Sequence, residues 1–332
     1  MRLLSRSILK GVPQNSPILK MQSHKRLPPL VVVLGPTAVG KTALSIQLAE
    51  RINGEIISAD SRLFYRGMDI GTAKPSKYDR QRIPHYLVDI ADPDEIWSLG
   101  RFKRETKRII TSIHRNGKIP ILVGGTGQYI RSITEGWVVP ELSADFHLRN
   151  VLKKWAEEIG VDGLHTRLAS IDSNAAAKIA PKNVRRTIRA LEVIFHTGRK
   201  FSELREREPV PYHVIQVGLS RSRQELYRRI DKRVDAMISS GFIAEVEKLL
   251  ERGYSPELPS MSAIGYGQIA SYINEGITLE EAVEQIKRLT RQFIRKQSNW
   301  FRKDDPSIQW FEMVPGVIDE VERYILKKFY NT

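Results

Sequence analysis

The stretch VVVLGPTAVGKT, residues 31–42, limits the fold more than any other part of the chain. Four apolar residues lead into Gly35, and Gly40, Lys41 and Thr42 complete a G-x-x-x-x-G-K-T pattern. The backbone N–H groups of such a loop, together with the helix that follows it, point at one phosphate group, and the lysine adds a positive charge. The pattern therefore predicts a buried strand, a phosphate-binding loop and a helix, in that order.

Strand and helix patterns alternate over the first 130 residues. In order, they predict a strand at 30–34, a helix at 41–53, a strand at 55–60, a helix from Ser98 to about Asn116, and a strand at 118–127. This alternation is typical of an α/β fold with a parallel sheet, in which ligands bind at the carboxyl ends of the strands. The phosphate loop, Asp60 and the GGTG segment at 124–127 each lie at such an end.

The pattern becomes mostly helical from about residue 140. A strand is expected at 212–220, and helices are expected at 145–159, 173–179, 183–197, 222–252, 259–275 and 279–303, with glycines such as Gly241 as breaks. We predict a P-loop NTPase-like α/β core with a parallel sheet and a mostly helical insertion domain. The core takes residues 30–139 and 211–315, C-terminal helices included, and the insertion takes residues 140–210.

Residues 1–29 contain six Lys or Arg residues and no acidic residue. This stretch resembles an organelle transit segment, although Met21 could equally be the true start of the protein. We expect a disordered basic extension on a cytoplasmic protein, or on an organellar one if the extension is a transit segment. The longest apolar runs are short strands, well below the roughly 18 residues that a membrane helix needs, so no membrane segment is expected.

The composition narrows the possible chemistry. The chain has no cysteine, which excludes disulfides, thiolate metal sites and cysteine nucleophiles. Its 53 Lys and Arg residues against 38 Asp and Glu residues give a net charge of +15. Clustered basic side chains gain affinity for a polyanion by releasing counterions from its phosphates, so a nucleic acid is one interpretation of this charge. The other interpretation is that the positive charge serves only to keep the protein soluble.

Two predicted helices carry basic side chains at helical spacing, namely Arg185, Arg186 and Arg189 on the first and Lys287, Arg291 and Arg295 on the second. These faces favour a nucleic-acid surface, with an ordinary solvated helix face as the alternative. Three aromatic residues of the second segment are expected in the core, because aromatic side chains at helical spacing are usually buried: Phe293, Trp300 and Phe301.

Asp60 closes the strand EIISAD, where it could act as a general base or simply cap a turn. Proteins that hydrolyse or transfer a phosphoryl group usually add a second strand that ends in an aspartate. Here the strand IPILVGG ends in glycines and Thr126, and YLVD, ending at Asp89, is the only other candidate. The loop is therefore expected to hold a diphosphate that leaves. One arginine of LYRRIDKRV could turn inward to stabilise it: Arg228, Arg229 or Arg233.

Seven segments share their sequence and order with a known family: GPTAVGKT, SADSRLFYRGMDIGTAKP, GGTGQY, NVRRTIRALE, LYRRIDKRV, AIGYGQ and TRQFIRKQSNWFR. They resemble the tRNA dimethylallyltransferases (tRNA isopentenyltransferases) of the bacterial type. The resemblance covers about residues 30–312, and DSRLFYRGMDIGTAKP is far more specific than the phosphate loop.

The resemblance implies transfer of a dimethylallyl (isopentenyl) group from dimethylallyl diphosphate. The acceptor would be the exocyclic N6 amine of the adenosine on the 3′ side of the tRNA anticodon, and diphosphate would leave. It also implies Mg²⁺ as the cofactor and the anticodon stem-loop as the part of tRNA that binds. We expect a monomer.

The resemblance also assigns residues to roles. Catalysis falls to Asp60 as general base, Thr126 beside the reacting atoms and Arg229 on the diphosphate. The diphosphate is expected to contact Gly35, Thr37, Ala38, Gly40, Lys41 and Thr42, and Thr42 would also bind the metal. The tRNA is expected to contact Asp60, Ser61, Arg62, Leu63, Phe64, Arg149, Arg185, Arg186, Arg189 and Gln268.

The chain departs from the family pattern at two positions. Gln128 stands where leucine is common, and Gly267 replaces a basic residue at an expected tRNA contact. Three other functions stay open. They are an adenylate isopentenyltransferase acting on free AMP or ATP, a P-loop nucleotide kinase or ATPase that depends on Asp89, and an RNA-binding regulator with a vestigial loop.

Overall fold

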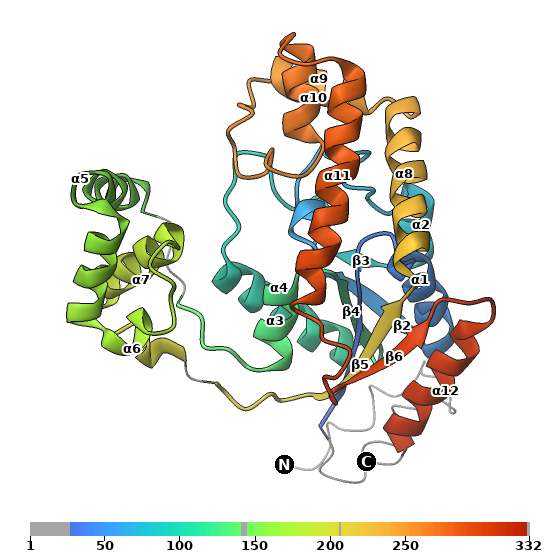
Figure 1. Ribbon diagram of the computed structural model, residues 1–332. Helices are drawn as coiled ribbons and strands as arrows, with labels where there is room; N and C mark the ends of the chain where they lie inside the picture. The colour runs from blue at the N-terminus through green and yellow to red at the C-terminus, as the bar shows by residue number, and fades with distance from the viewer. Residues whose placement is uncertain (1–26, 141–144, 206, 331–332) are drawn as a thin grey trace. The chain divides into compact units, whose positions relative to one another are not determined.

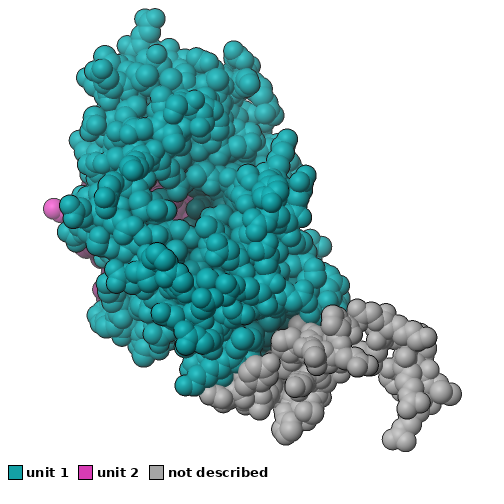
Figure 2. Space-filling model, turned by 90° about the vertical axis from the view of Figure 1, so that its right-hand side faces the viewer, with its two compact units in different colours: residues 1–96, 106–130, 211–332 teal, residues 97–105, 131–210 magenta. Residues whose placement is uncertain are grey.

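The computed structural model describes residues 27–140, 145–205 and 207–330. The chain forms two compact units, which Figure 2 colours separately. Unit 1 comprises Met1–Ile96, Thr106–Ile130 and Pro211–Thr332, and unit 2 comprises Trp97–Glu105 and Arg131–Val210. The predicted disordered extension falls mostly on residues 1–26, which lie outside the described residues.

Unit 1 is built on a parallel sheet with the strand order β3-β2-β4-β1-β5-β6. The strands are β1 (Pro29–Leu34), β2 (Gly54–Ser58), β3 (His85–Tyr86), β4 (Ile119–Gly124), β5 (His213–Ser220) and β6 (Ile308–Glu312). All six residues of β1 are buried, because β1 lies between β4 and β5. A strand in that position must be apolar on both faces, which explains the unbroken run LVVVL. The predicted parallel α/β core is confirmed.

The helix α1 (Lys41–Ile52) follows the phosphate loop, as predicted. Its apolar stripe of Leu44, Leu48 and Ile52 is buried, and α1 packs beside β1, β2 and β4. The spacing of four residues places these side chains on one face of the helix. The strand, loop and helix that the motif predicts are therefore all present.

The remaining helices of the core sequence are α2 (Lys77–Arg82), α3 (Leu99–Arg115), α4 (Gly127–Thr134), α8 (Arg223–Ser239), α9 (Phe242–Glu251), α10 (Tyr266–Ile273), α11 (Leu279–Ser298) and α12 (Val317–Tyr330). In Figure 1, α8, α9, α10 and α11 gather at one end of unit 1, where they contact one another. The break between α8 and α9 falls at Gly241, where φ is 95° and glycine has no steric penalty.

One predicted helix in this region needs correction, and two elements were missed. The helix expected at 259–275 begins only at Tyr266, because residues 259–265 form successive turns that end in Gly265 at φ 111°. The strand β6 and the helix α12 were not predicted. β6 is five residues long and takes its place by pairing with β5, about 90 residues earlier in the chain, so no local pattern reveals it.

Unit 2 contains a helical bundle of α5 (Phe146–Ile171), α6 (Ser173–Ala176) and α7 (Val184–Thr197). These helices enclose a buried apolar cluster that includes Leu152, Leu164, Leu168, Leu191 and Ile194. α5 consists of two helices that meet at Gly160, whose φ of 79° and ψ of 159° are not helical, so the helix predicted at 145–159 ends where expected. The second helix, which continues to Ile171, was not predicted. Within the described residues, no helix is long and apolar enough to span a membrane.

Candidate active site

The phosphate loop follows β1 and is pressed against β5. A side chain at Gly35 would place its Cβ 2.6 Å from the carbonyl oxygen of Leu219, so only glycine fits there. The backbone has positive φ at Gly35 (146°), Ala38 (65°) and Gly40 (114°). Loops that mix left-handed and right-handed residues turn successive N–H groups toward one point and form anion-binding concavities. A non-glycine residue with φ of 65° is strained, and such strain concentrates at ligand sites.

Lys41 lies folded over its own loop. Its Nζ donates to the carbonyl oxygens of Gly35 and Pro36, both at 2.9 Å. An ammonium group has three N–H donors, so one is left for a ligand. Burial lowers the pKa of Lys41 to about 8, while nearby Asp60 raises this pKa and Arg233 lowers it further. The lysine is thus a poorly hydrated cation that an incoming anion would stabilise.

Asp60 caps the short 3₁₀ helix Ser61–Phe64 and also faces a cavity. Its Oδ1 accepts from the backbone N–H of Arg62 at 3.1 Å. Its Oδ2 makes no hydrogen bond with any described residue. The two interpretations of Asp60, as a cap and as a chemical group, are therefore compatible, because the cap uses only one of the two oxygens.

The cavity lies within unit 1 and has a volume of about 470 Å³, a size that suits a small ligand. Its polar wall includes residues of the phosphate loop, the segment after β2, the GGTG segment, α8 and α11: Thr37, Asp60, Ser61, Arg62, Thr126, Gln128, Arg233, Lys296 and Gln297. Its apolar wall includes Ile230, Val234, Met237, Ile264, Ile286, Leu289, Phe293 and Trp300. The structure therefore brings Asp60, Thr126 and the start of the phosphate loop to one cavity, as the strand ends predicted.

Two arginines of α8 lie in different surroundings. Arg229 is exposed, and its Nε donates to the carbonyl oxygen of Ala38 on the phosphate loop at 2.7 Å. Arg233 lines the cavity, and its guanidinium donates to the carbonyl oxygen of Thr72 at 3.3 Å. Burial lowers the pKa of Arg233, although the Asp60 carboxylate opposes that shift.

Arg233 is therefore the α8 arginine that lines the cavity, and the diphosphate role that the resemblance assigned to Arg229 stays a prediction. A spacing signal was available in the sequence. Arg233 falls on the same helical face as Ile230, Val234 and Met237, which all line the cavity with it. Residues spaced three, four and seven positions apart share one face of a helix.

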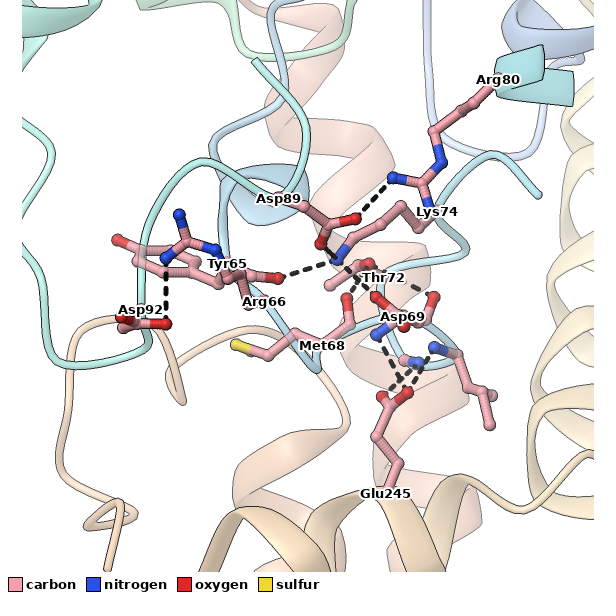
Figure 3. A network of polar contacts seen from close by, with 12 residues as sticks. Tyr65, Arg66, Met68, Asp69, Thr72, Lys74, Arg80, Asp89, Asp92 and Glu245 are labelled. Atoms are coloured by element: carbon pink, nitrogen blue, oxygen red, sulfur yellow. Dashed lines mark hydrogen bonds and ion pairs between the residues drawn. The ribbon is translucent and has the colours of Figure 1, made fainter. Parts of the chain in front are cut away.

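The motif segment RGMDIGTAKP forms a loop whose polar groups are occupied by other parts of the protein (Figure 3). From α9, the Glu245 carboxylate accepts from three successive backbone N–H groups, those of Asp69 at 2.9 Å, Ile70 at 2.7 Å and Gly71 at 3.1 Å. It also accepts from the hydroxyl of Tyr266 at 2.7 Å. Because Gly71 and Thr72 line the cavity, this carboxylate fixes one of its walls.

Lys74 anchors the other end of the same loop, and its side chain is only 2% exposed. Its Nζ donates to Tyr65 O at 2.8 Å and to the carboxylates of Asp69 and Asp89, both at 2.5 Å. Asp89 also accepts from Arg80 at 2.5 Å. Burial would raise the pKa of Asp89, but its contacts with Lys74 and Arg80 outweigh burial and lower that pKa. Asp89, the candidate for a phosphoryl-transfer strand, is therefore engaged in the scaffold and does not line the cavity.

In the predicted RNA-contacting segment after Asp60, some side chains line the cavity and others are buried in the core. Ser61 and Arg62 line the cavity, and Arg62 also donates to the carbonyl oxygen of Pro259 at 2.7 Å. Leu63 is half-buried. The side chain of Phe64 is fully buried and stacks on the ring of Tyr129 at 5.9 Å. Phe64 is thus a core residue that supports the segment from within, which corrects the expectation that it is a surface contact.

The basic side chains of unit 2 differ in how they are held. Glu192 is fully buried, and its carboxylate receives Arg149 Nε at 2.9 Å and Arg189 at 2.6 Å. Burial would raise the pKa of Glu192, but these two arginines lower it. Arg185 and Arg186 project from the first turn of α7 and are exposed.

The second basic face, on α11, is partly an internal contact. Lys287 pairs with Asp235 of α8 at 2.8 Å, and Arg291 pairs with Asp231 of α8 at 2.6 Å, whereas Arg295 is exposed. Two of the three cations thus join α11 to α8, so this face supports a nucleic-acid surface less than its charge suggested.

Of the three aromatic residues expected in the core, only one is buried. Phe301 is 5% exposed, as predicted, but Phe293 and Trp300 are 39% and 37% exposed and line the cavity.

Gln268 and Gly267 lie on α10, away from the cavity lining. The Oε1 of Gln268 accepts from the backbone N–H of Gly265 at 2.9 Å, so this side chain caps its own helix. A side chain at Gly267 would meet no atom within 4 Å, so the missing basic residue leaves open space. Gln128 is exposed at the cavity edge.

Comparison with known proteins places the chain among related sequences. The IPP transferase family model matches residues 63–304, more than half of the chain. A tRNA dimethylallyltransferase of Roseiflexus sp. (strain RS-1) is 50% identical over 275 residues, which cover 83% of this chain and 90% of the relative. A tRNA dimethylallyltransferase of Thermomicrobium roseum is 44% identical over 298 residues, which cover 90% of each protein.

Two solved structures share the fold. The full-length tRNA isopentenylpyrophosphate transferase of Bacillus halodurans matches with a TM-score of 0.68 and 41% identity, over 91% of this chain and 96% of that one. A eukaryotic dimethylallyltransferase acting on tRNA matches with a TM-score of 0.75 and 31% identity, over 86% of this chain and 74% of that one. With the motifs, the cavity and these matches taken together, the chain belongs to the IPP transferase family.

Proposed function

We propose that this protein transfers a dimethylallyl group from dimethylallyl diphosphate to the N6 amine of the adenosine on the 3′ side of a tRNA anticodon. The protein is a tRNA dimethylallyltransferase, as its curated relatives are named. The observation that carries the mechanism is that one cavity is lined by Asp60, Thr126 and Arg233 and adjoins the phosphate loop. A carboxylate and an anion site then face the same space.

The diphosphate would bind at the phosphate loop. The backbone N–H groups of Ala38, Gly40, Lys41 and Thr42, the spare donor of the Lys41 side chain and the guanidinium of Arg233 would supply positive charge where the leaving group gains negative charge. Gly35, Thr37 and Gly40 shape the loop. Arg229 steadies it through the carbonyl oxygen of Ala38, while Arg233 is the arginine that meets the diphosphate.

The amine would react beside Asp60. The nitrogen lone pair forms a bond to C1 of the dimethylallyl group, the C1–O bond breaks, and its electron pair leaves with the diphosphate. The proton of the amine passes to the free Oδ2 of Asp60. Thr126 is half-buried at the cavity wall, and its hydroxyl makes no hydrogen bond within the described residues, so it is available to orient a substrate.

Mg²⁺ fits the residues that are present. Among the described residues, no group of three or more His, Cys, Asp or Glu side chains could hold a metal by itself. Mg²⁺ in phosphate sites needs only one or two protein ligands, since substrate oxygens and water supply the rest. Thr42 is exposed, and its hydroxyl has no hydrogen bond within the described residues. Thr42 would therefore hold the ion, which neutralises charge on the leaving diphosphate.

The tRNA would contact exposed groups of both units. On unit 2, whose residues 140–210 we propose as a tRNA-binding domain, Arg185 and Arg186 suit phosphate contacts, and Arg149 and Arg189 lie beside them on Glu192. On unit 1, Ser61, Arg62 and Leu63 lie near the cavity, and Gln268 has an unused amide N–H₂ group. A stacked base cannot reach a cavity, so the adenosine must flip out of the anticodon loop. We propose that one chain suffices for the reaction.

The function is tested by incubating the protein with Mg²⁺, labelled dimethylallyl diphosphate, and either unmodified tRNA or free AMP. We expect label at the single adenosine next to the anticodon. Label in AMP alone would indicate an adenylate isopentenyltransferase. Absence of label in both, together with ATP hydrolysis in a parallel incubation with ATP, would indicate a nucleotide kinase or ATPase.

The Asp60→Asn variant tests the base. An amide keeps the oxygen that caps the 3₁₀ helix but cannot accept the proton, so we expect kcat to fall about 100- to 10,000-fold. The tRNA dissociation constant should stay nearly unchanged. An equal loss of tRNA binding and turnover would mean that Asp60 is structural.

A further inference from the structure

Gln297 joins two loops that are far apart in the sequence. It lies in the last turn of α11, and it is 4% exposed. Its Oε1 accepts from the backbone N–H of Thr37 at 2.9 Å, and its Nε2 donates to the carbonyl oxygen of Gly125 at 3.2 Å. Both ends of one amide are thus used, one on the phosphate loop and one on the GGTG loop.

These two loops follow neighbouring strands and carry opposite halves of the reaction. β1 leads into the phosphate loop, β4 leads into the GGTG loop, and the two strands pair in parallel. The first loop is the diphosphate site, and the second presents Thr126 directly after Gly125. The separation of the loops therefore sets where the leaving group lies relative to Thr126.

The end of α11 packs so closely against the GGTG loop that no side chain fits at Gly125 or Gly127. A Cβ on Gly125 would lie 2.3 Å from Nε2 of Gln297 and 3.3 Å from the carbonyl oxygen of Gly35. A Cβ on Gly127 would lie 2.3 Å from the ring of Trp300. The glycines of this motif thus allow α11 and the phosphate loop to approach the GGTG loop closely. The amide of Gln297 lies between the two loops.

We propose that Gln297 is a positioning residue for prenyl transfer, which holds the phosphate loop and the Thr126 loop at the separation that the reaction needs. This inference rests on the proposed function. The neutral amide of Gln297, which accepts at one end and donates at the other, satisfies Thr37 N–H and Gly125 C=O together. An ionised glutamate would accept from Thr37 N–H but repel the carbonyl oxygen of Gly125. An apolar side chain would bond to neither group.

The test compares Gln297→Met and Gln297→Glu with wild type. A misplacement of about 1 Å costs up to about 100-fold in rate, so we expect Gln297→Met to lower kcat about 10- to 100-fold. The KM values for both substrates and the dissociation constant of inorganic pyrophosphate should change less than about threefold, since each loop keeps its own binding groups.

Gln297→Glu adds a readout that loss of folding cannot mimic. A protonated glutamate can donate to Gly125 C=O, so its kcat relative to wild type should rise as the pH falls. Gln297→Met should show no such rescue.

Ser298→Ala is the matched control. Ser298 is the exposed neighbour of Gln297 on α11 and donates only to its own helix, to Arg295 O at 2.7 Å, so kcat should be unchanged.

A kcat within twofold of wild type in Gln297→Met would overturn the inference, as would a Gln297→Glu variant without pH rescue. If wild type itself transfers no label to tRNA, the proposed function fails and the inference fails with it. If wild type transfers label and the Gln297 variants behave like wild type, the inference alone fails.

Discussion

The phosphate loop and the loop at 69–74 are the two most recognisable motifs of this sequence, and the structure uses them in opposite ways. Each carries one motif lysine. Lys41 gives two of its three N–H groups to carbonyl oxygens of its own loop and keeps one. Lys74 gives all three to Tyr65 O, Asp69 and Asp89. An ammonium with an unused donor can receive an anion, whereas a saturated one serves as a scaffold.

The difference extends to the backbone. In the phosphate loop, the N–H groups of Thr37 and Val39 donate to Gln297 and Pro36, whereas those of Ala38, Gly40, Lys41 and Thr42 have no acceptor among the described residues. At 69–71, three successive N–H groups are already taken by Glu245. A motif therefore marks a ligand site only where its donors remain unfilled.

Lys41→Met should give the largest effect. The substitution removes the charge of the lysine that we propose binds the diphosphate, so we expect kcat/KM for dimethylallyl diphosphate to fall about 100- to 1,000-fold. The thermal midpoint should not fall, because a half-buried, poorly hydrated cation with a pKa of about 8 adds little to folding. Steady-state kinetics and a thermal melt measure the two quantities. A lowered midpoint with nearly intact kinetics would reverse the contrast between the two lysines.

Lys74→Met should instead act on stability. It leaves the carboxylates of Asp69 and Asp89 without their buried cation. Breaking a fully buried pair costs about 3–5 kcal/mol, and the partial exposure of both carboxylates reduces this to about 2–3 kcal/mol. Urea unfolding measures the loss. In the folded fraction, the KM for dimethylallyl diphosphate should stay within about threefold of wild type, and a larger change would assign Lys74 to the substrate site.

The smallest effect should be a pH dependence of anion binding. With its pKa lowered to about 8 by burial, Lys41 should lose its proton as the pH rises through this value, and a bound diphosphate would raise the pKa again by stabilising the charged form. Affinity for inorganic pyrophosphate should therefore fall above pH 8, by up to about tenfold for each pH unit.

The Lys41→Met variant supplies the baseline for this titration, because pyrophosphate itself also titrates. The difference between wild type and Lys41→Met, measured by calorimetry, should shrink as the pH rises. A constant difference from pH 7 to 10 would show that Lys41 does not titrate in this range.

Much of the fold follows from local pattern. The strand, loop and helix at 30–52 were predicted because five consecutive apolar residues indicate a buried strand and apolar residues four positions apart indicate a helix. Asp60 and Thr126 were predicted to meet the phosphate loop because parallel strands end at the same edge of a sheet. The strand β6 and the helix α12 were missed, since β6 takes its structure from pairing with β5.

By itself, the sequence determined the α/β core, the phosphate loop and the family motifs, because periodicity and glycine spacing are local properties. Tertiary structure alone decided which charges serve ligands. Arg233 enters the cavity while Arg229 holds the loop, Glu192 occupies two arginines of unit 2, and Glu245 and Gln297 fix loops some 170 residues away in the chain. The physical reason is that a charged or amide side chain is free or occupied according to its neighbours in space, which spacing along the chain does not specify.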